Sequence, residues 1–189
     1  MSSIFIRTGN SCTIVTRFWD IVEEAEKLYG ERDKSFTILG IEGIMGDQPK
    51  SIIDSEQKTI LIQLTTGGVM DMNRAILQAS HVAIHCLSPS SSSERSMLEE
   101  GLATHFSLKY SKEKTKVDWI LYDACEIEAS KLVEEALKHD SRLVKKFRAE
   151  FGKLSNISER ELLAVSPKLP KPIAEKLAMQ YAWEKTLRV

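Results

Sequence analysis

Residues 71–87, DMNRAILQASHVAIHCL, decide the fold prediction. This stretch predicts a helix, and Asp71 or Asn73 can cap it by accepting hydrogen bonds from first-turn N–H groups. His81 and His85 are four residues apart, so they lie one turn apart on the same face of that helix. Because two imidazoles at this spacing can bind one metal ion, the stretch is a candidate metal-binding helix.

A helix and a small sheet are expected before this stretch. Residues 13–30 have helical apolar spacing and end at a glycine, which suits a helix C-terminus. Residues 35–64 contain three short segments that predict strands, namely SFTILGIEG, PKSIID and KTILIQL. We expect an antiparallel sheet, because the connectors are too short for helical crossovers. In the last strand, alternate residues would share one face, namely Ile60, Ile62 and Leu64. TTGGVM, 65–70, is expected to be a loop.

The chain after the histidine helix is expected to be mostly helical. A serine run, 88–93, predicts a mobile connector. Gly101 lies inside the next helix, where a glycine indicates close approach of a neighbour. The fold class is therefore α+β, with residues 1–111 as the α+β part and residues 112–189 as a C-terminal helical lobe. The expected elements of this half are helices 94–111, 120–140, 141–152 and 172–187, a surface loop at 113–119, and a capping box at Ser158 and Glu161.

Glu100 is the candidate for a third metal ligand. A catalytic zinc ion takes three protein ligands and keeps one position for water. Glu100 lies in LEEGLATHFS, and residues 86–99 separate it from His85. That length is enough to finish one helix, turn, and place a second helix beside the first.

The order H-x-x-x-H, a proline-containing turn and then L-E-E-G-L-A resembles the gluzincin metallopeptidases. The resemblance covers roughly residues 13–111. It implies a zincin-like fold in which His81, His85 and Glu100 bind zinc. It also implies that the strand at 58–64 is a sheet edge beside a cleft that binds an extended peptide or protein segment.

Val82 departs from the H-E-x-x-H pattern of that family. In active members, a glutamate at this position polarises the zinc-bound water and passes its proton to the leaving amine. Valine cannot accept a proton, and loss of a general base typically forfeits ~10²–10⁴-fold in rate. The sequence therefore predicts a metallopeptidase-like protein that is catalytically impaired.

Three explanations of Val82 remain open. The protein is a natural pseudopeptidase, or the valine was introduced to inactivate it, or another acid such as Glu99 reaches the water. Glu99 points about 100° away from Glu100 on a helix, which better suits a residue behind the ligand or a surface charge. The alternative function is a metal-free interaction module, which binds a protein partner in the former cleft and by strand addition at 58–64.

Several other polar residues are expected to have roles other than metal binding. His105 is offset by roughly 140° from Glu100 on a helix and is expected to be a packing or surface residue. His139 lies near a helix end and should face solvent. Asp71 and Asp123 are candidate hydrogen-bond partners for the ligand imidazoles.

Composition argues against several kinds of partner. The chain has 189 residues, a formal net charge of −1 and a pI near 6.4, so we expect neither nucleic acid nor a membrane as partner. No apolar run approaches the ~18 residues that a membrane span needs. The N-terminal residues lack the long apolar region of a secretory signal. The three cysteines suggest reduced thiols in a cytoplasmic protein, with Cys86 as a buried thiol, although a protein exported without a signal would look the same. They are Cys12, Cys86 and Cys125.

Overall fold

The computed structural model describes residues 9–46 and 48–182, with side chains from Ile14 onward. The chain divides into two compact units, which are described separately below. Unit 1 comprises Met1–Pro89 and Phe106–Trp119, and unit 2 comprises Ser90–His105 and Ile120–Val189. The helix α4 (Met97–Thr115) therefore contributes residues to both units, whereas the sequence predicted a boundary after residue 111.

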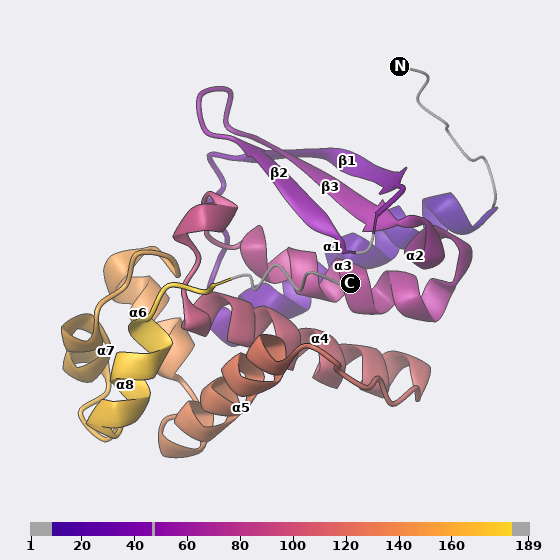
Figure 1. The fold of residues 1–189 in the computed structure, drawn as a ribbon. Coiled ribbons are helices and arrows are strands. Elements are labelled where there is room, and N and C mark those ends of the chain that lie inside the picture. The colour runs from indigo at the N-terminus through magenta and orange to yellow at the C-terminus, as the bar shows by residue number, and fades with distance from the viewer. Residues whose placement is uncertain (1–8, 47, 183–189) are drawn as a thin grey trace. The chain divides into compact units, whose positions relative to one another are not determined.

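Unit 1 is an α+β unit built around a three-stranded sheet (Figure 1). The helix α1 runs longer than predicted and ends at Tyr29, followed by Gly30 with a φ of 97°. The helix α3 confirms the predicted histidine helix. Besides part of α4, the elements of the unit are α1 (Gly9–Tyr29), β1 (Thr37–Ile44), β2 (Lys50–Asp54), β3 (Thr59–Thr65), α2 (Thr66–Met70) and α3 (Met72–His85).

The sheet is mixed, with strand order β1-β3-β2. β2 pairs antiparallel with β3, as predicted, but β1 pairs parallel with β3. The antiparallel prediction is wrong for that pair because it assumed that consecutive strands are neighbours. The chain reverses direction after β1 and again after β2, so β3 returns in the direction of β1 and lies between the two earlier strands.

The position of β3 corrects a second expectation. β3 forms backbone pairs along both of its sides, with β1 on one and β2 on the other. The segment 58–64 is therefore a central strand, and the predictions that it is a peptide-binding edge or a site of strand addition are wrong. The edge strands of this sheet are β1 and β2.

One face of the sheet forms the core of unit 1. Ile60, Ile62 and Leu64 of β3 are at most 1% exposed, which confirms that they share the inward face. The helices α1 and α3 run along that side of the sheet (Figure 1), and α1 contributes buried residues such as Phe18 and Ile21. Burying these side chains is the main source of stability in such a unit.

The predicted loop 65–70 is instead the short helix α2. Thr65 caps it by accepting a hydrogen bond from the Gly68 backbone N–H (3.3 Å). Gln78 of α3 holds this cap: its Nε2 donates to Thr65 Oγ1 (2.7 Å) and its Oε1 accepts from the Thr65 backbone N–H (3.0 Å). A Cβ at Gly68 would collide with the Gln78 side chain. Tertiary contact with Gln78 therefore overrides the weak helix propensity of the two glycines.

Unit 2 consists of helices joined by short turns. Its elements, besides part of α4, are the 3₁₀ turn η1 (Ser92–Glu94), α5 (Ala124–His139), α6 (Leu143–Phe151), α7 (Glu159–Val165) and α8 (Lys171–Ala178). The serine run therefore contains ordered structure, and η1 has its own capping box with Ser91 and Glu94. The predicted capping box of Ser158 and Glu161 is confirmed.

Three helices of unit 2 can be compared with their predicted boundaries. The helix expected at 120–140 begins at Ala124, because Asp123 caps it. The helix expected at 141–152 ends at Phe151, followed by Gly152 with a φ of 69°, as predicted. The helix expected at 172–187 ends at Ala178. The prediction is therefore wrong for residues 179–182, which are not helical. Residues 183–187 lie outside the described part of the chain.

Gly101 sits where α4 and α5 approach each other closely. A Cβ at this position would collide with the backbone carbonyl oxygen of Ala129 and lie 2.9 Å from Val133 Cγ2. The prediction of a close neighbour is therefore confirmed. The glycine lets two helix backbones approach more closely than any side chain would allow.

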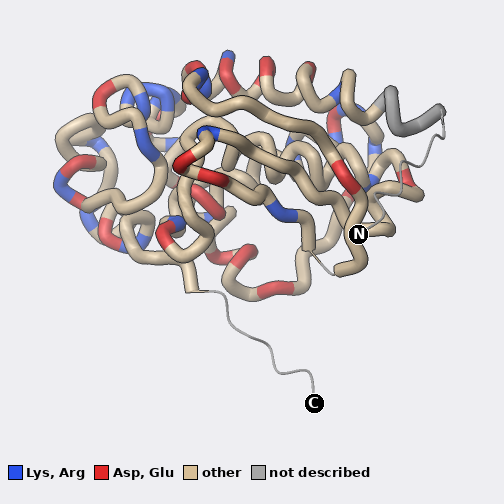
Figure 2. The backbone as a smooth tube through the Cα atoms, turned by 90° about the horizontal axis from the view of Figure 1, so that it is seen from above, with Lys and Arg blue, Asp and Glu red and all other residues tan. Residues whose placement is uncertain are grey.

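Acidic and basic residues are interspersed along the described backbone (Figure 2), in keeping with the formal net charge of −1. Within residues 9–46 and 48–182, none of the helices combines the length and apolar character needed to cross a bilayer. Cys86 is buried, as predicted, and among the described residues neither it nor Cys125 forms a disulfide. The side chain of Cys12 lies outside the described residues.

Candidate metal centre

The helix α3 places His81 and His85 beside each other. Their ring centroids are 5.1 Å apart, with an angle of 67° between the ring planes. His85 is only 2% exposed, and His81 is partly exposed. Asp71 begins the helix by accepting a hydrogen bond from the Asn73 backbone N–H (2.9 Å), which confirms it as the N-cap. The two imidazoles thus extend from one rigid helix at the predicted spacing.

Val82 lies in the interior of the protein with 0% of its surface exposed. Its neighbours along α3, Ala83 and Ile84, are also fully buried. The side chain at the position of the missing general base is therefore an apolar residue in an apolar stretch of helix. It offers no proton acceptor, and it contributes to packing.

Glu100 lies in the first turn of α4 and is 2% exposed. Its carboxylate oxygen Oε1 accepts a hydrogen bond from Nη1 of Arg95 at 2.9 Å. A buried carboxylate is costly unless it is paired. The guanidinium of Arg95 supplies one such partner.

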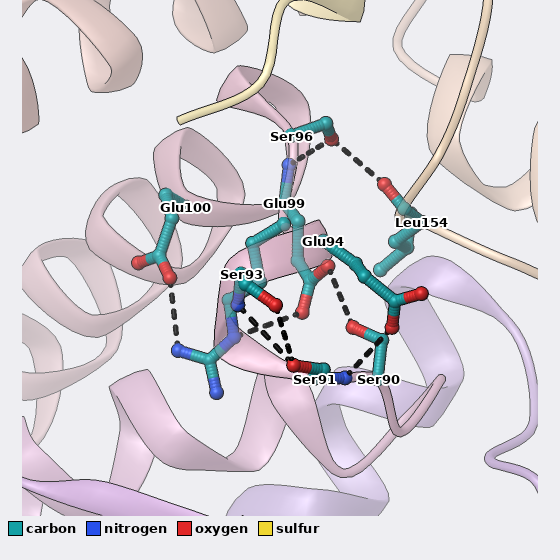
Figure 3. Close-up of polar contacts among 9 residues, drawn as sticks. Ser90, Ser91, Ser93, Glu94, Ser96, Glu99, Glu100 and Leu154 are labelled. Carbon is teal, nitrogen blue, oxygen red and sulfur yellow. Dashed lines mark hydrogen bonds and ion pairs between the residues drawn. The ribbon is translucent and has the colours of Figure 1, made fainter. Parts of the chain in front are cut away.

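Glu99 is also buried, with 1% of its surface exposed, so its interpretation as a surface charge is wrong. Its Oε1 lies 3.7 Å from Nε of Arg95, and the Ser90 hydroxyl donates to its Oε2 at 3.4 Å (Figure 3). The carboxylate of Glu99 is therefore held by Arg95 and Ser90. Arg95 therefore connects the carboxylate of Glu99 to that of Glu100.

The structure brings together the three predicted ligands. His81, His85 and Glu100 each offer one ligand atom, and these atoms all lie within 4.8 Å of one another. Ligand atoms around a four-coordinate zinc ion are about 3.3 Å apart, and separations within 4.8 Å are of the same order. Two imidazole nitrogens and a carboxylate oxygen are also a donor set of known catalytic zinc sites.

The remaining candidates have structural roles. Asp71 caps α3 at a point about 15 Å along the helix axis from His81, so its prediction as a partner for a ligand imidazole is wrong. Asp123 Oδ1 accepts from the backbone N–H groups of Cys125 (2.8 Å) and Glu126 (3.0 Å) and so caps α5. His139 is exposed in the last turn of α5, as predicted.

The sequence did not predict a role for Arg95 in this candidate centre. Arg95 is 6% exposed and lies between η1 and α4. The available signal was its spacing, since Arg95 precedes Glu99 by four residues and Glu100 by five. Opposite charges four residues apart commonly pair on a helix, but the sequence alone does not show that the pair is buried.

Comparison with protein-family models, curated proteins and solved structures gives no match for this chain. Function is therefore inferred from the side chains of the centre. Their types, burial and separation are the observations on which the proposal below depends.

Proposed function

We propose that this protein is a gluzincin-like zinc metallopeptidase homologue in which peptide hydrolysis is weakened. His81, His85 and Glu100 would bind one zinc ion, and an extended peptide segment would be the substrate or ligand. The single observation that carries this proposal is the presence of three donor atoms within 4.8 Å of one another. When bound, zinc would supply a Lewis acid and lower the pKa of its bound water.

The side chains of the centre support cation binding. His81 and His85 belong to one helix, so little ordering is needed to present both imidazoles to one ion. Arg95, Glu99 and Glu100 are buried and together carry a formal charge of −1. Since charges interact more strongly away from water, a divalent cation beside this group is electrostatically favoured.

The proposed impairment follows from Val82 and Glu99. Val82 cannot take a proton, and its side chain is fully buried. Glu99 is the nearest acid in sequence to Glu100, but Arg95 and Ser90 contact its carboxylate. A carboxylate held in this way is poorly placed to act as a general base, so we expect a rate lower by ~10²–10⁴-fold than that of a complete site.

The decisive experiment is metal analysis of the purified protein and of single-ligand variants. The wild-type protein, dialysed against buffer with trace zinc, should retain about one zinc ion per chain. His81→Ala and Glu100→Gln should lose most of it. His139→Ala is the matched control, because it removes an exposed histidine at the end of α5, and it should retain zinc.

Two results would count against the proposal. One is a wild-type protein that takes up no zinc at stoichiometric level. The other is zinc retention in His81→Ala and Glu100→Gln that equals that of the His139→Ala control. Circular dichroism of each variant verifies that a loss of zinc does not simply reflect a loss of fold.

A further inference from the structure

Arg95 is a buried arginine between two buried glutamates. Its side chain is 7% exposed, with Nη1 at 2.9 Å from Oε1 of Glu100 and Nε at 3.7 Å from Oε1 of Glu99. We propose that Arg95 is a positioning residue, which fixes the carboxylate of Glu100 for metal binding. This inference rests on the proposed function, because it takes Glu100 to be a ligand.

The chemistry of the guanidinium suits this role. A guanidinium is planar and presents several N–H groups in a fixed geometry, so one arginine can contact two carboxylates at once. Arg95 donates to Oε1 of Glu100, and a carboxylate has two oxygens, so a contact with arginine and a bond to a metal ion can coexist on it. Glu99, with the Ser90 hydroxyl on its Oε2, in turn limits the movement of the arginine. Glu99 therefore helps to hold Arg95 in place, and Arg95 in turn holds Glu100.

The backbone of Arg95 is held by a distant part of unit 2. The Arg95 carbonyl accepts a hydrogen bond from the Tyr181 N–H (2.9 Å), and the Met97 N–H donates to the Met179 carbonyl (2.8 Å). Ser96 between them forms an isolated antiparallel bridge with Gln180. Residues 95–97 are therefore paired with residues 179–181 at the start of α4.

A second contact fixes the same short segment. The Ser96 hydroxyl donates to the Leu154 carbonyl oxygen (2.7 Å) and also accepts from the Glu99 backbone N–H (3.1 Å) (Figure 3). The segment before α4 is thus tied to two separate parts of unit 2. The position of the guanidinium does not depend on the serine run alone.

A purely stabilising role would be a weak explanation of this group. A buried ion pair costs so much desolvation that apolar residues of similar volume often serve stability equally well. Residues that hold metal ligands, in contrast, typically change metal affinity by about 10–100-fold when mutated. The burial of Arg95 beside a candidate ligand therefore points to ligand placement.

Zinc affinity and the visible spectrum of the cobalt-substituted protein test the inference. Zinc affinity is measured by competition with a chromophoric chelator, in wild type, Arg95→Met, Arg95→Lys and Arg148→Met. Arg148 is a second buried arginine of unit 2, at 8% exposure on α6, and serves as the matched control. We expect Arg95→Met to weaken zinc binding by about 10–100-fold and to alter the cobalt spectrum, because Glu100 leaves its place. Arg148→Met should resemble wild type in both.

The outcomes are distinguishable. If wild type binds zinc through His81 and Glu100 but Arg95→Met keeps the wild-type affinity and cobalt spectrum, the role of Arg95 is refuted and the metal site stands. If wild type binds no zinc, the proposed function fails, and this inference fails with it. Should Arg95→Met not fold, Arg95→Lys decides, because a lysine keeps the charge but cannot contact both carboxylates in the same way. It should still bind zinc more weakly than wild type, and unchanged affinity would refute the inference.

Discussion

Replacing Val82 with glutamate restores the H-E-x-x-H pattern, and we expect it to destabilise the protein. Val82 is 0% exposed, so the new carboxyl group would enter an apolar interior. A buried carboxyl group avoids the cost of a buried charge by remaining protonated. The pKa of the introduced carboxyl group would then rise toward the ~8–9 documented for buried glutamates, whereas in the unfolded chain it would stay near ~4.3.

The magnitude follows from this difference. At pH 7 the folded variant keeps a proton that the unfolded chain releases, which costs about 1.4 kcal/mol per pH unit above the unfolded pKa. The penalty is therefore about 4 kcal/mol at pH 7 and about 1 kcal/mol at pH 5. The poorer packing of the longer side chain adds about 1–3 kcal/mol at any pH. Since domains are typically stable by about 5–15 kcal/mol, the variant should be close to unfolding at neutral pH.

The assay is urea denaturation followed by circular dichroism, with a chelator present, at pH 5 and pH 7. Val82→Gln is the matched control, because it has nearly the same shape and cannot ionise. The free energy of unfolding of Val82→Glu should fall by about 3 kcal/mol more than that of Val82→Gln between the two pH values. Equal stabilities of both variants at pH 5 and pH 7 would refute the argument and show that position 82 accommodates a charge.

The same variant also tests catalysis. If the rest of the site is complete, zinc-loaded and folded Val82→Glu should hydrolyse peptides faster than wild type, by up to ~10²–10⁴-fold. No gain in a variant that is shown to be folded and zinc-loaded would mean that more than one residue of the site has changed.

Three further predictions concern single positions. Gly101→Ala should lower the free energy of unfolding by about 1–3 kcal/mol in urea denaturation, because its Cβ would collide with the Ala129 carbonyl oxygen; wild-type stability would contradict that packing. Asp123→Ala should cost about 1 kcal/mol in the same assay through loss of the α5 cap, whereas Asp123→Asn should cost much less. Burial raises the pKa of Tyr29 to about 12, above the ~10 of an unfolded tyrosine, so stability should fall as pH rises from about 10 toward 12. Denaturation of Tyr29→Phe over the same pH range should show a smaller fall, and an equal fall would assign the effect to other groups.

The local features of this chain were predictable from its sequence. The histidine helix, the Asp71 cap, the inward face of β3 and the close contact at Gly101 all follow from spacing or from the properties of single residues. Each depends on the chain within a turn or a strand of the residue concerned. Local rules therefore suffice for them.

The features that were predicted wrongly depend on contacts between residues far apart in the sequence. The order of the strands depends on which segments pair, and the connectors alone do not determine it. The helix α2 forms because Gln78 holds its N-cap residue, Thr65. The last helix stops at Ala178, where residues 179–181 begin to pair with residues 95–97. The buried position of Arg95 belongs to the same class, since only the fold removes it from water.

The order β1-β3-β2 has a consequence for how the protein is made. The central strand is the last of the three to leave the ribosome, so β1 has no neighbour to pair with until β3 arrives. β2 and β3 are joined by the turn at residues 55–58, in which Asp54 Oδ1 accepts from the Gln57 N–H (2.8 Å). Because a short loop closes at less entropic cost than a long one, this hairpin should form before Thr37 of β1 finds its partner Thr59.

Until β1 joins, one side of the apolar segment KTILIQL has unpaired backbone groups. Such an edge is prone to pair with another chain. We therefore expect substitutions that delay the docking of β1 to reduce the soluble yield of the protein more than they reduce the stability of molecules that have folded.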